Sequence, residues 1–464
     1  WLFRPFNRFF NKSSNKYQGA VSRALGKRGA VFLVYILLLT GTGAMFQVVP
    51  PGFIPIQDKM YLIAGVKLPE GASLERTDQL LQRVVDIGME TDGVSHAVAF
   101  PGLNALQFTN TSNTGLVFFP LEPFDQRSRS AAQINEEING RIAGLKEGFA
   151  FSFMPPPILG LGNGNGYQMF IEDRGNLGYG ELQNAVNAMQ GAIAQTPGMG
   201  FPITSYQANV PQLNAEVDRE RAKAQGVPLT GLFDTLQTYL GSTYVNDFNR
   251  FGRTWQVIAQ ADAPFRDSVT DIANLKTRSS SGAMVPIGSV ANLVNDSGPS
   301  RVVRYNLFPA SELQGNPAMG VSSGQALQVM EQMATSTLPQ GFTYEWTELA
   351  YQQKAAGSGA TMIFLMAVVF VFLVLAAQYE AFTLPLAVIL IVPMCLLAAI
   401  IGVNLRGLDN NILVQIGLVV LIALAAKNAI LIVEFAKQAE EEQGMNRFDA
   451  AVAAARTRLR PILM

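Results

Sequence analysis

The feature that most constrains this chain of 464 residues is a set of apolar runs, each long enough to cross a lipid bilayer, which needs about 20 helical residues. One run comes early, and three follow one another late in the chain, separated by short loops. They predict membrane-spanning helices at residues 29–49, 360–377, 382–405 and 412–435, and the start of a truncated one at 449–464. Buried helices of a soluble protein are the alternative, which the close succession of the late runs disfavours. Because the chain lacks a first Met and stops inside an apolar stretch, we expect a piece of a longer protein.

Basic side chains predict the orientation of these helices. Residues 1–28 contain aromatic side chains and no acid, and they carry seven bases, Arg4, Arg8, Lys12, Lys16, Arg23, Lys27 and Arg28. This pattern is typical of a basic amphipathic helix on an anionic membrane surface, with a solvated basic tail as the alternative. The positive-inside rule places this segment and the bases of residues 437–460 in the cytoplasm, and residues 50–358 on the other side.

Composition excludes several classes of function. The chain is 49% hydrophobic and only 15% charged, and its net charge of −1 argues against a nucleic-acid partner. A single cysteine, Cys395, and a single histidine, His96, exclude a disulfide framework and a zinc site built from such side chains. The Gly-rich stretch 155–166 lacks the P-loop pattern and indicates a hinge. No nucleophile–base set is recognisable, so we expect neither an enzyme nor a bound cofactor.

The region between the first and second apolar runs has the pattern of a soluble α/β protein. Strands at 60–68, 94–100, 115–121 and 149–153 are predicted to alternate with helices at 73–89 and from Ser130, where Ser130 and Gln133 fit a capping box. The order β-α-β-β-α-β is that of a ferredoxin-like unit. A second unit follows and is interrupted by an insertion around 209–297. The predicted fold class is an α-helical membrane protein with a large α+β external region of ferredoxin-like (βαββαβ) subdomains.

Lys427 lies inside the last complete apolar run, in the stretch LIALAAKNAILIVEF. A charged group near the centre of a membrane helix costs about 2.5–3.5 kcal/mol on insertion, so it is usually paired and functional. Burial lowers a lysine pKa and a carboxylate raises it, so such a pair would make a proton switch. None of the other three spans supplies an acid, so a partner would come from elsewhere. A snorkelling lysine is the alternative, and Arg458 is equally consistent with a positive-inside anchor.

Apolar and aromatic side chains gather in three neighbouring strands or loops of the first external unit. Such residues are usually core, but an aromatic in the Asn- and Thr-rich loop 104–113 suggests an exposed lining. Core and binding pocket therefore remain open as interpretations of one set, Phe100, Leu103, Phe108, Phe118, Phe151 and Phe153.

Several stretches together resemble the hydrophobe/amphiphile branch of the resistance–nodulation–division (RND) multidrug efflux pumps, and correspond to the C-terminal half of such an inner-membrane permease. They are GFIP at 52–55, NTG at 113–115, YVNDF at 244–248, YN at 305–306, AAQYE at 376–380, AKNAILIVEFAK at 426–437 and RLRPILM at 458–464. The stretches 100–103 and 246–253 are most similar to the MexF/OqxB-like subgroup.

The resemblance implies a proton/drug antiporter, a homotrimer in the inner membrane of a Gram-negative bacterium. It would use the proton gradient and no cofactor to move hydrophobic drugs, with a periplasmic adaptor (membrane-fusion) protein and an outer-membrane channel protein as partners. Its porter subdomains would be residues 54–158 and residues 159–208 with 298–347, and its docking subdomain residues 209–297. A metal-ion pump of the same superfamily and a membrane-anchored interaction or secretion-assisting protein without transport are the alternatives.

The resemblance also implies roles for individual residues. Lys427 and Arg458 would belong to a proton relay whose two aspartates lie outside this sequence. The drug-binding residues would be Phe118, Phe151 and Phe153, joined by Phe100, Phe108 and Leu103. The loop between Gly102 and Asn113 differs from better-known members in length and composition, which affects the expected substrate range.

Overall fold

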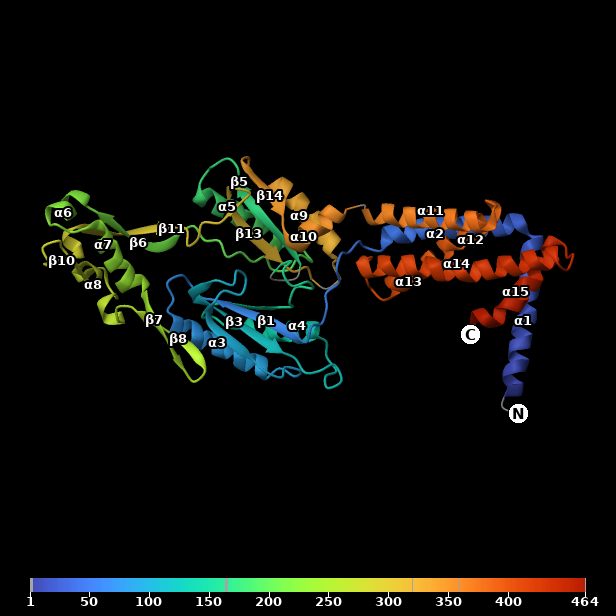
Figure 1. The fold of residues 1–464 in the computed structure, drawn as a ribbon, viewed down its shortest axis with the longest axis horizontal. Coiled ribbons are helices and arrows are strands. Elements are labelled where there is room, and N and C mark those ends of the chain that lie inside the picture. The colour runs from blue at the N-terminus through green and yellow to red at the C-terminus, as the bar shows by residue number, and fades with distance from the viewer. Residues whose placement is uncertain (1–2, 163–165, 319, 358, 464) are drawn as a thin grey trace. The chain divides into compact units, whose positions relative to one another are not determined.

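The computed structural model describes residues 3–162, 166–318, 320–357 and 359–463. The predicted segments 1–28, 155–166 and 449–464 each include residues outside these ranges, namely Trp1, Leu2, residues 163–165 and Met464. The chain divides into two compact units (Figure 1). One contains Trp1–Leu68, Ala72–Ser205 and Val303–Met464, and the other contains Pro69–Gly71 and Tyr206–Val302. The second unit is somewhat larger than the insertion predicted at 209–297.

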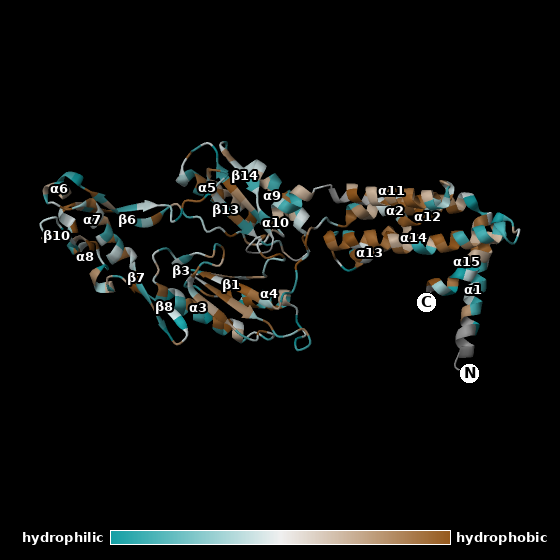
Figure 2. Cartoon of the chain, in the orientation of Figure 1, coloured by the Kyte–Doolittle hydropathy of each residue, from teal (hydrophilic) through white to brown (hydrophobic). Residues whose placement is uncertain are grey.

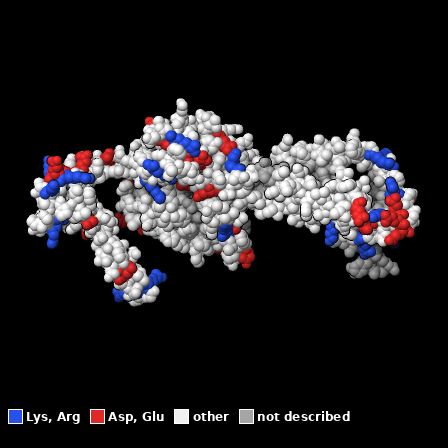
Figure 3. Space-filling model, turned by 45° about the horizontal axis from the view of Figure 1, so that its top comes forward, with Lys and Arg blue, Asp and Glu red and all other residues white. Residues whose placement is uncertain are grey.

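The helices of the first unit include an apolar group, drawn brown in Figure 2. Within the described residues, three spans are long and apolar enough to cross a membrane: α2 (Arg28–Val48), α12 with α13 (Thr383–Leu405), and α14 (Ile412–Glu441). A further apolar helix is α11 (Gly359–Tyr379). Two further helices are α1 (Phe3–Gly26) and α15 (Arg447–Leu463). In Figure 3 charged side chains gather where α14 ends, whereas the apolar helices are almost free of them.

The single helix expected at 382–405 is interrupted. α12 covers Thr383–Ile389 and α13 covers Val392–Leu405, with a turn between them. Pro393 has no N–H to donate to the carbonyl of Ile389, four residues earlier, so a regular helix cannot continue through this point. The Pro393 carbonyl instead accepts a hydrogen bond from Thr42 Oγ1 of α2 at 3.2 Å.

The first sheet contains β1 (Tyr61–Lys67), β2 (Val98–Leu103), β3 (Asn110–Pro120) and β4 (Phe149–Phe153) in the order β2-β3-β1-β4, with antiparallel neighbours. Helices α3 (Leu74–Met89) and α4 (Ala131–Ile142) cover one face. The capping box of Ser130 and Gln133 is confirmed. Strand β3 begins at Asn110 rather than Gly115, so half of the loop predicted at 104–113 is strand. Strand β2 likewise lies at Val98–Leu103, later than predicted.

The second sheet brings together distant parts of the sequence. Its order is β12-β13-β5-β14, formed by β12 (Arg304–Tyr305), β13 (Phe308–Gly315), β5 (Tyr167–Asp173) and β14 (Phe342–Trp346). It is accompanied by α5 (Tyr179–Gln195), α9 (Ser323–Thr337) and α10 (Glu348–Ala356). The strands before and after the inserted unit thus lie side by side.

The inserted unit has its own small core and several short elements. They are β6 (Val210–Val217) paired with β11 (Ala291–Gly298), α6 (Arg219–Ala224), α7 (Leu229–Leu236), the hairpin β7 (Thr243–Arg250) and β8 (Arg253–Ala259), α8 (Val269–Asn274), and β9 (Lys276–Arg278) paired with β10 (Met284–Pro286). A π-helical turn at Gln237–Gly241 follows α7 directly.

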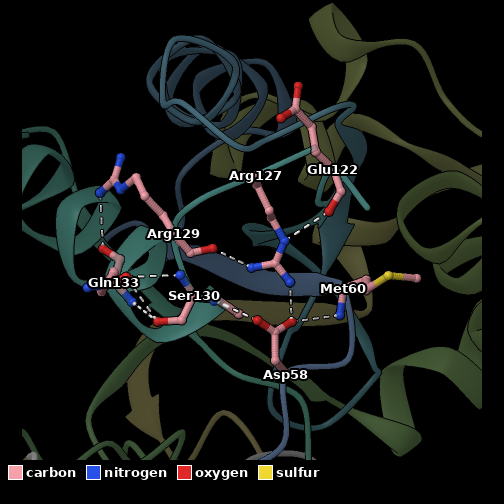
Figure 4. A network of polar contacts seen from close by, with 8 residues as sticks. Asp58, Met60, Glu122, Arg127, Arg129, Ser130 and Gln133 are labelled. Atoms are coloured by element: carbon pink, nitrogen blue, oxygen red, sulfur yellow. Dashed lines mark hydrogen bonds and ion pairs between the residues drawn. The ribbon is translucent and has the colours of Figure 1, made fainter. Parts of the chain in front are cut away.

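A buried ion pair fastens the segment between α2 and β1 to the first sheet (Figure 4). Arg127 Nη2 lies 2.7 Å from Asp58 Oδ1, and the Arg127 side chain is only 3% exposed. The same carboxylate accepts hydrogen bonds from the backbone N–H groups of Ala131, at the start of α4, and Met60. Burial alone would raise the pKa of Asp58, but these bonds and the Arg127 charge outweigh it and hold the pKa below its ordinary value.

The chain that leaves α2 is also bonded to two other helices. The Asn410 N–H donates to Pro50 O at 2.9 Å, and the Gly52 N–H donates to Asn410 O at 3.2 Å, just before α14 begins. Ser322, the N-cap of α9, donates its hydroxyl to Pro51 O at 2.7 Å. One short segment therefore touches the start of α14 and the start of a helix on the second sheet.

Candidate functional site

The face of the first sheet opposite α3 and α4 carries the aromatic residues singled out in the sequence. In the strand register, Ile63 of β1 lies between Phe118 and Phe153, and Gly65 lies between Leu116 and Phe151. Side chains alternate along a strand, so all of these positions point to the same face. The opposite face supplies the core, in which Leu62, Val66 and Phe119 are buried.

A cavity of about 460 Å³ lies along the edge strand β4, and residues of this aromatic face, of α4 and of β13 in the second sheet line it. Phe151 and Phe153, both predicted, line it, and Phe149 and Phe201 line it as well. Ring centroids are 5.8 Å apart between Phe153 and Phe151, 5.4 Å between Phe151 and Phe149, and 5.3 Å between Phe149 and Phe201. The four rings form a continuous apolar surface, which we call the phenylalanine ladder, and such a surface suits flat hydrophobic ligands.

A neighbouring cavity of about 240 Å³ shares part of the ladder. Phe149, Phe151 and Phe201 line both cavities, and Lys67 is a charged residue in the lining of the smaller one. The loop between β2 and β3 contributes Leu106 and is fastened by a hydrogen bond from the Gln107 amide to Ser205 Oγ. The two cavities are therefore one apolar cleft with a cationic edge.

Gly65 makes room for the ladder. An added Cβ at this position would lie 2.7 Å from the Phe151 ring and 2.9 Å from the Ala105 methyl group. Both distances are shorter than a normal contact, so any side chain at position 65 would push Phe151 out of its place.

The other predicted drug-binding residues lie outside the two cavity linings. Phe118 and Leu103 pack beside Phe151 and Phe153 as a second layer, and Phe100 meets the Phe118 ring edge-on at 6.0 Å. Phe108 is half exposed with φ of 50° at the tip of its loop, because Asn104 Oδ1 caps the preceding turn and directs the chain outward.

The sequence interpretation missed Phe149 and Phe201. Phe149 follows from the alternation of strand β4, because it is two residues before Phe151 and must share its face. Phe201 is 62% exposed in a loop rich in Gly and Pro, and no local pattern marks it. Only the return of the chain toward the first sheet brings its ring to Phe149.

Lys427 lies on α14, on a side that the described helices leave exposed. Ala425, Ala426 and Ala429 face the packed side of the same helix. Within the described residues, no ion pair involves Lys427. The lysine therefore points to where another helix could pack.

Arg458 contacts the same helix farther along. Its guanidinium carbon lies 3.7 Å from the centre of the Phe435 ring on α14. Phe435 is eight residues beyond Lys427, about 12 Å along the helix axis. Arg458 is half buried and its Nε has no hydrogen-bond partner among the described residues. Lys427 is thus on α14 and Arg458 is on α15, and the structure does not bring the two predicted relay residues together.

The described residues contain no cluster of three or more His, Cys, Asp or Glu side chains that could hold a metal ion. The site consists instead of an apolar cleft and a lysine in a membrane helix. Burial raises the pKa of Tyr61, whose ring centroid is 6.4 Å from that of Phe118, so this phenol stays neutral beside the cleft.

Sequence comparison supplies the family. The profile of the AcrB/AcrD/AcrF family matches residues 1–464. The chain belongs to this family. Its relatives include the toluene efflux pump membrane transporter TtgB of Pseudomonas putida, 37% identical over 467 residues, and the multidrug export protein AcrF of Escherichia coli, 36% identical over 471 residues. Both alignments cover all of this chain but only 44% and 45% of the relatives, so the chain spans less than half their length. The resemblance to RND efflux transporters is confirmed.

Proposed function

We propose that this chain forms the C-terminal half of a proton-driven RND permease that exports hydrophobic and amphiphilic compounds. The observation that carries the proposal is the phenylalanine ladder in a cavity of about 460 Å³, a volume within the usual range for small-molecule sites. Family membership supports the same function, because the relatives are named as efflux transporters of toluene and of multiple drugs.

The two sheets serve in this proposal as ferredoxin-like porter subdomains, and the inserted unit as the docking subdomain. The element order of the first sheet, β1-α3-β2-β3-α4-β4, supports the assignment. A ligand would lie against the phenylalanine ladder, which Phe201 extends beyond Phe149. Widening and narrowing the cleft between the sheets would then admit and expel it.

Lys427 is the proposed proton-responsive group. It would pair with acidic residues supplied from outside this sequence, and protonation of those acids would release it. Arg458, packed on Phe435, would hold the cytoplasmic end of α14. A movement of α14 would reach α9 through the segment at Pro50 and Pro51, which is bonded to both ends. No cofactor is required, because the proton gradient supplies the energy.

The membrane-spanning helices and the large region between them support a place in the inner membrane of a Gram-negative bacterium. The proposed assembly is a homotrimer with a periplasmic adaptor (membrane-fusion) protein and an outer-membrane channel protein. Through these partners, compounds taken from the periplasm or the inner membrane would leave the cell.

Ligand binding tests the proposal. The native polypeptide that carries this sequence is titrated with a fluorescent amphiphilic dye, and a saturable change is expected. Removing one ring of the ladder, Phe151→Ala or Phe201→Ala, should weaken binding about tenfold, because a buried aromatic contact is worth roughly 1–1.5 kcal/mol. Phe265→Ala is the control, since Phe265 is an exposed aromatic in the inserted unit. Equal affinity in all four proteins would contradict the assignment of the cleft.

A further inference from the structure

Helix α1 carries its bases on one side. At about 100° per residue, Arg8, Lys12, Lys16 and Arg23 fall within an arc of about 80°, and Lys27 follows directly after the helix. All five side chains are exposed, and α1 contains no acidic residue. We call this set the cationic stripe. Within the described residues no acidic side chain forms an ion pair with any of the five.

The side of α1 opposite the stripe is already occupied. Ser14 is 7% exposed there, and α1 packs along α15. The guanidinium carbon of Arg460 on α15 lies 5.8 Å from the centre of the Phe10 ring. Contact with α15 thus fixes how α1 is rotated, and this rotation keeps the stripe outward.

The stripe also lies at the edge of the membrane. Lys27, with φ of −115° and ψ of 50°, breaks the helix between the end of α1 and the start of α2 at Arg28, so the two helices are separate. Because α2 is a membrane-spanning helix of 21 residues, α1 ends where the hydrocarbon of the bilayer ends. The cations at this end of α1, Arg23 and Lys27, therefore lie at the level of the headgroups of the surrounding lipids.

We propose that the cationic stripe of α1 is a binding surface for anionic phospholipid headgroups. Charge complementarity selects this partner, since the stripe has five positive charges and no compensating acid. Between residues 8 and 26, the flank next to the stripe is polar but neutral, with exposed Asn11, Asn15 and Ser22, so the positive charge of that stretch lies on one side of the helix. Anionic lipids such as phosphatidylglycerol would therefore be enriched along α1 relative to zwitterionic lipids.

Energy transfer from α1 to labelled lipids tests the proposal. Cys395 is the only cysteine in the sequence, so Cys395→Ala permits a single label at Ala20→Cys. Ala20 is exposed and neighbours Lys16 and Lys27 on the helix surface. The native polypeptide is reconstituted in phosphatidylcholine nanodiscs with a trace of acyl-labelled phosphatidylglycerol or acyl-labelled phosphatidylcholine. We expect at least about twofold more energy transfer to labelled phosphatidylglycerol than to labelled phosphatidylcholine. The two should approach equality in 0.5 M salt, where a Debye screening length of ~4 Å weakens the attraction.

The variant Lys12→Gln, Lys16→Gln, Arg23→Gln should abolish the preference. The control Arg250→Gln, Arg253→Gln, Arg266→Gln removes the same charge from exposed positions of the inserted unit and should keep it. Equal transfer to both lipids in the unsubstituted protein, as expected if the stripe serves an acidic protein instead, would overturn the proposal. A preference that survives loss of the stripe would overturn it too.

Discussion

Replacing Asp58 by Asn should loosen the attachment of the first sheet to the segment that leaves α2. The carboxylate forms an ion pair with Arg127 at 2.7 Å and accepts hydrogen bonds from the Ala131 N–H at 2.8 Å and the Met60 N–H at 3.1 Å. An Asn amide keeps one acceptor oxygen and turns the other into a donor, so one backbone bond is lost. The bond to Arg127 also loses its charge assistance, and Arg127 stays buried. Together these losses amount to about 2–3 kcal/mol.

Hydrogen exchange measures this loss in the native polypeptide. A change of about 2–3 kcal/mol corresponds to about 30- to 150-fold faster exchange of the amides around Met60 and Ala131, when they exchange by local opening. Glu147→Gln is the control, because Glu147 pairs with Arg83 on the exposed surface and its loss should change nothing measurable. If Asp58→Asn exchanges at the same rate as this control, the ion pair does not hold the segment and the reasoning is wrong.

Three further outcomes follow from the structure. The folded-state pKa of Asp58 is lowered, so its contribution to the free energy of unfolding should be lost only as the pH falls below the ordinary Asp pKa of about 3.9. Asp58→Asn should lack this acid-dependent loss when unfolding is measured over a series of pH values. Gly65→Val should displace Phe151 and abolish saturable dye binding with little change in helix content by circular dichroism. Ser130→Ala removes the N-cap of α4 and should cost about 1 kcal/mol in urea unfolding; an unchanged midpoint would contradict the cap.

Much of the fold could be predicted because it depends on local patterns. Apolar length marks the membrane helices, and the Ser130 cap marks the start of α4. The break at Pro393 was also available locally, since a proline inside a helix removes a hydrogen bond. The early start of β3 was not, because Asn110 is a poor strand former that nonetheless pairs with Leu103 of β2.

The candidate site was predictable only in part. Strand alternation places Phe149, Phe151 and Phe153 on one face from sequence alone. Phe201, at the end of the phenylalanine ladder, depends on a tertiary contact with Phe149. The proposed role of Lys427 depends on acidic partners from outside this sequence.

Proton-coupled transport in liposomes tests the central claim most directly. The native polypeptide that carries this sequence is reconstituted, a pH gradient is imposed, and dye movement and proton flux are recorded together. We predict that Lys427→Ala abolishes both while dye affinity at the phenylalanine ladder is unchanged. Lys437→Ala, ten residues along the same helix at its polar end, should retain both. Transport by Lys427→Ala at the unsubstituted rate would contradict the account.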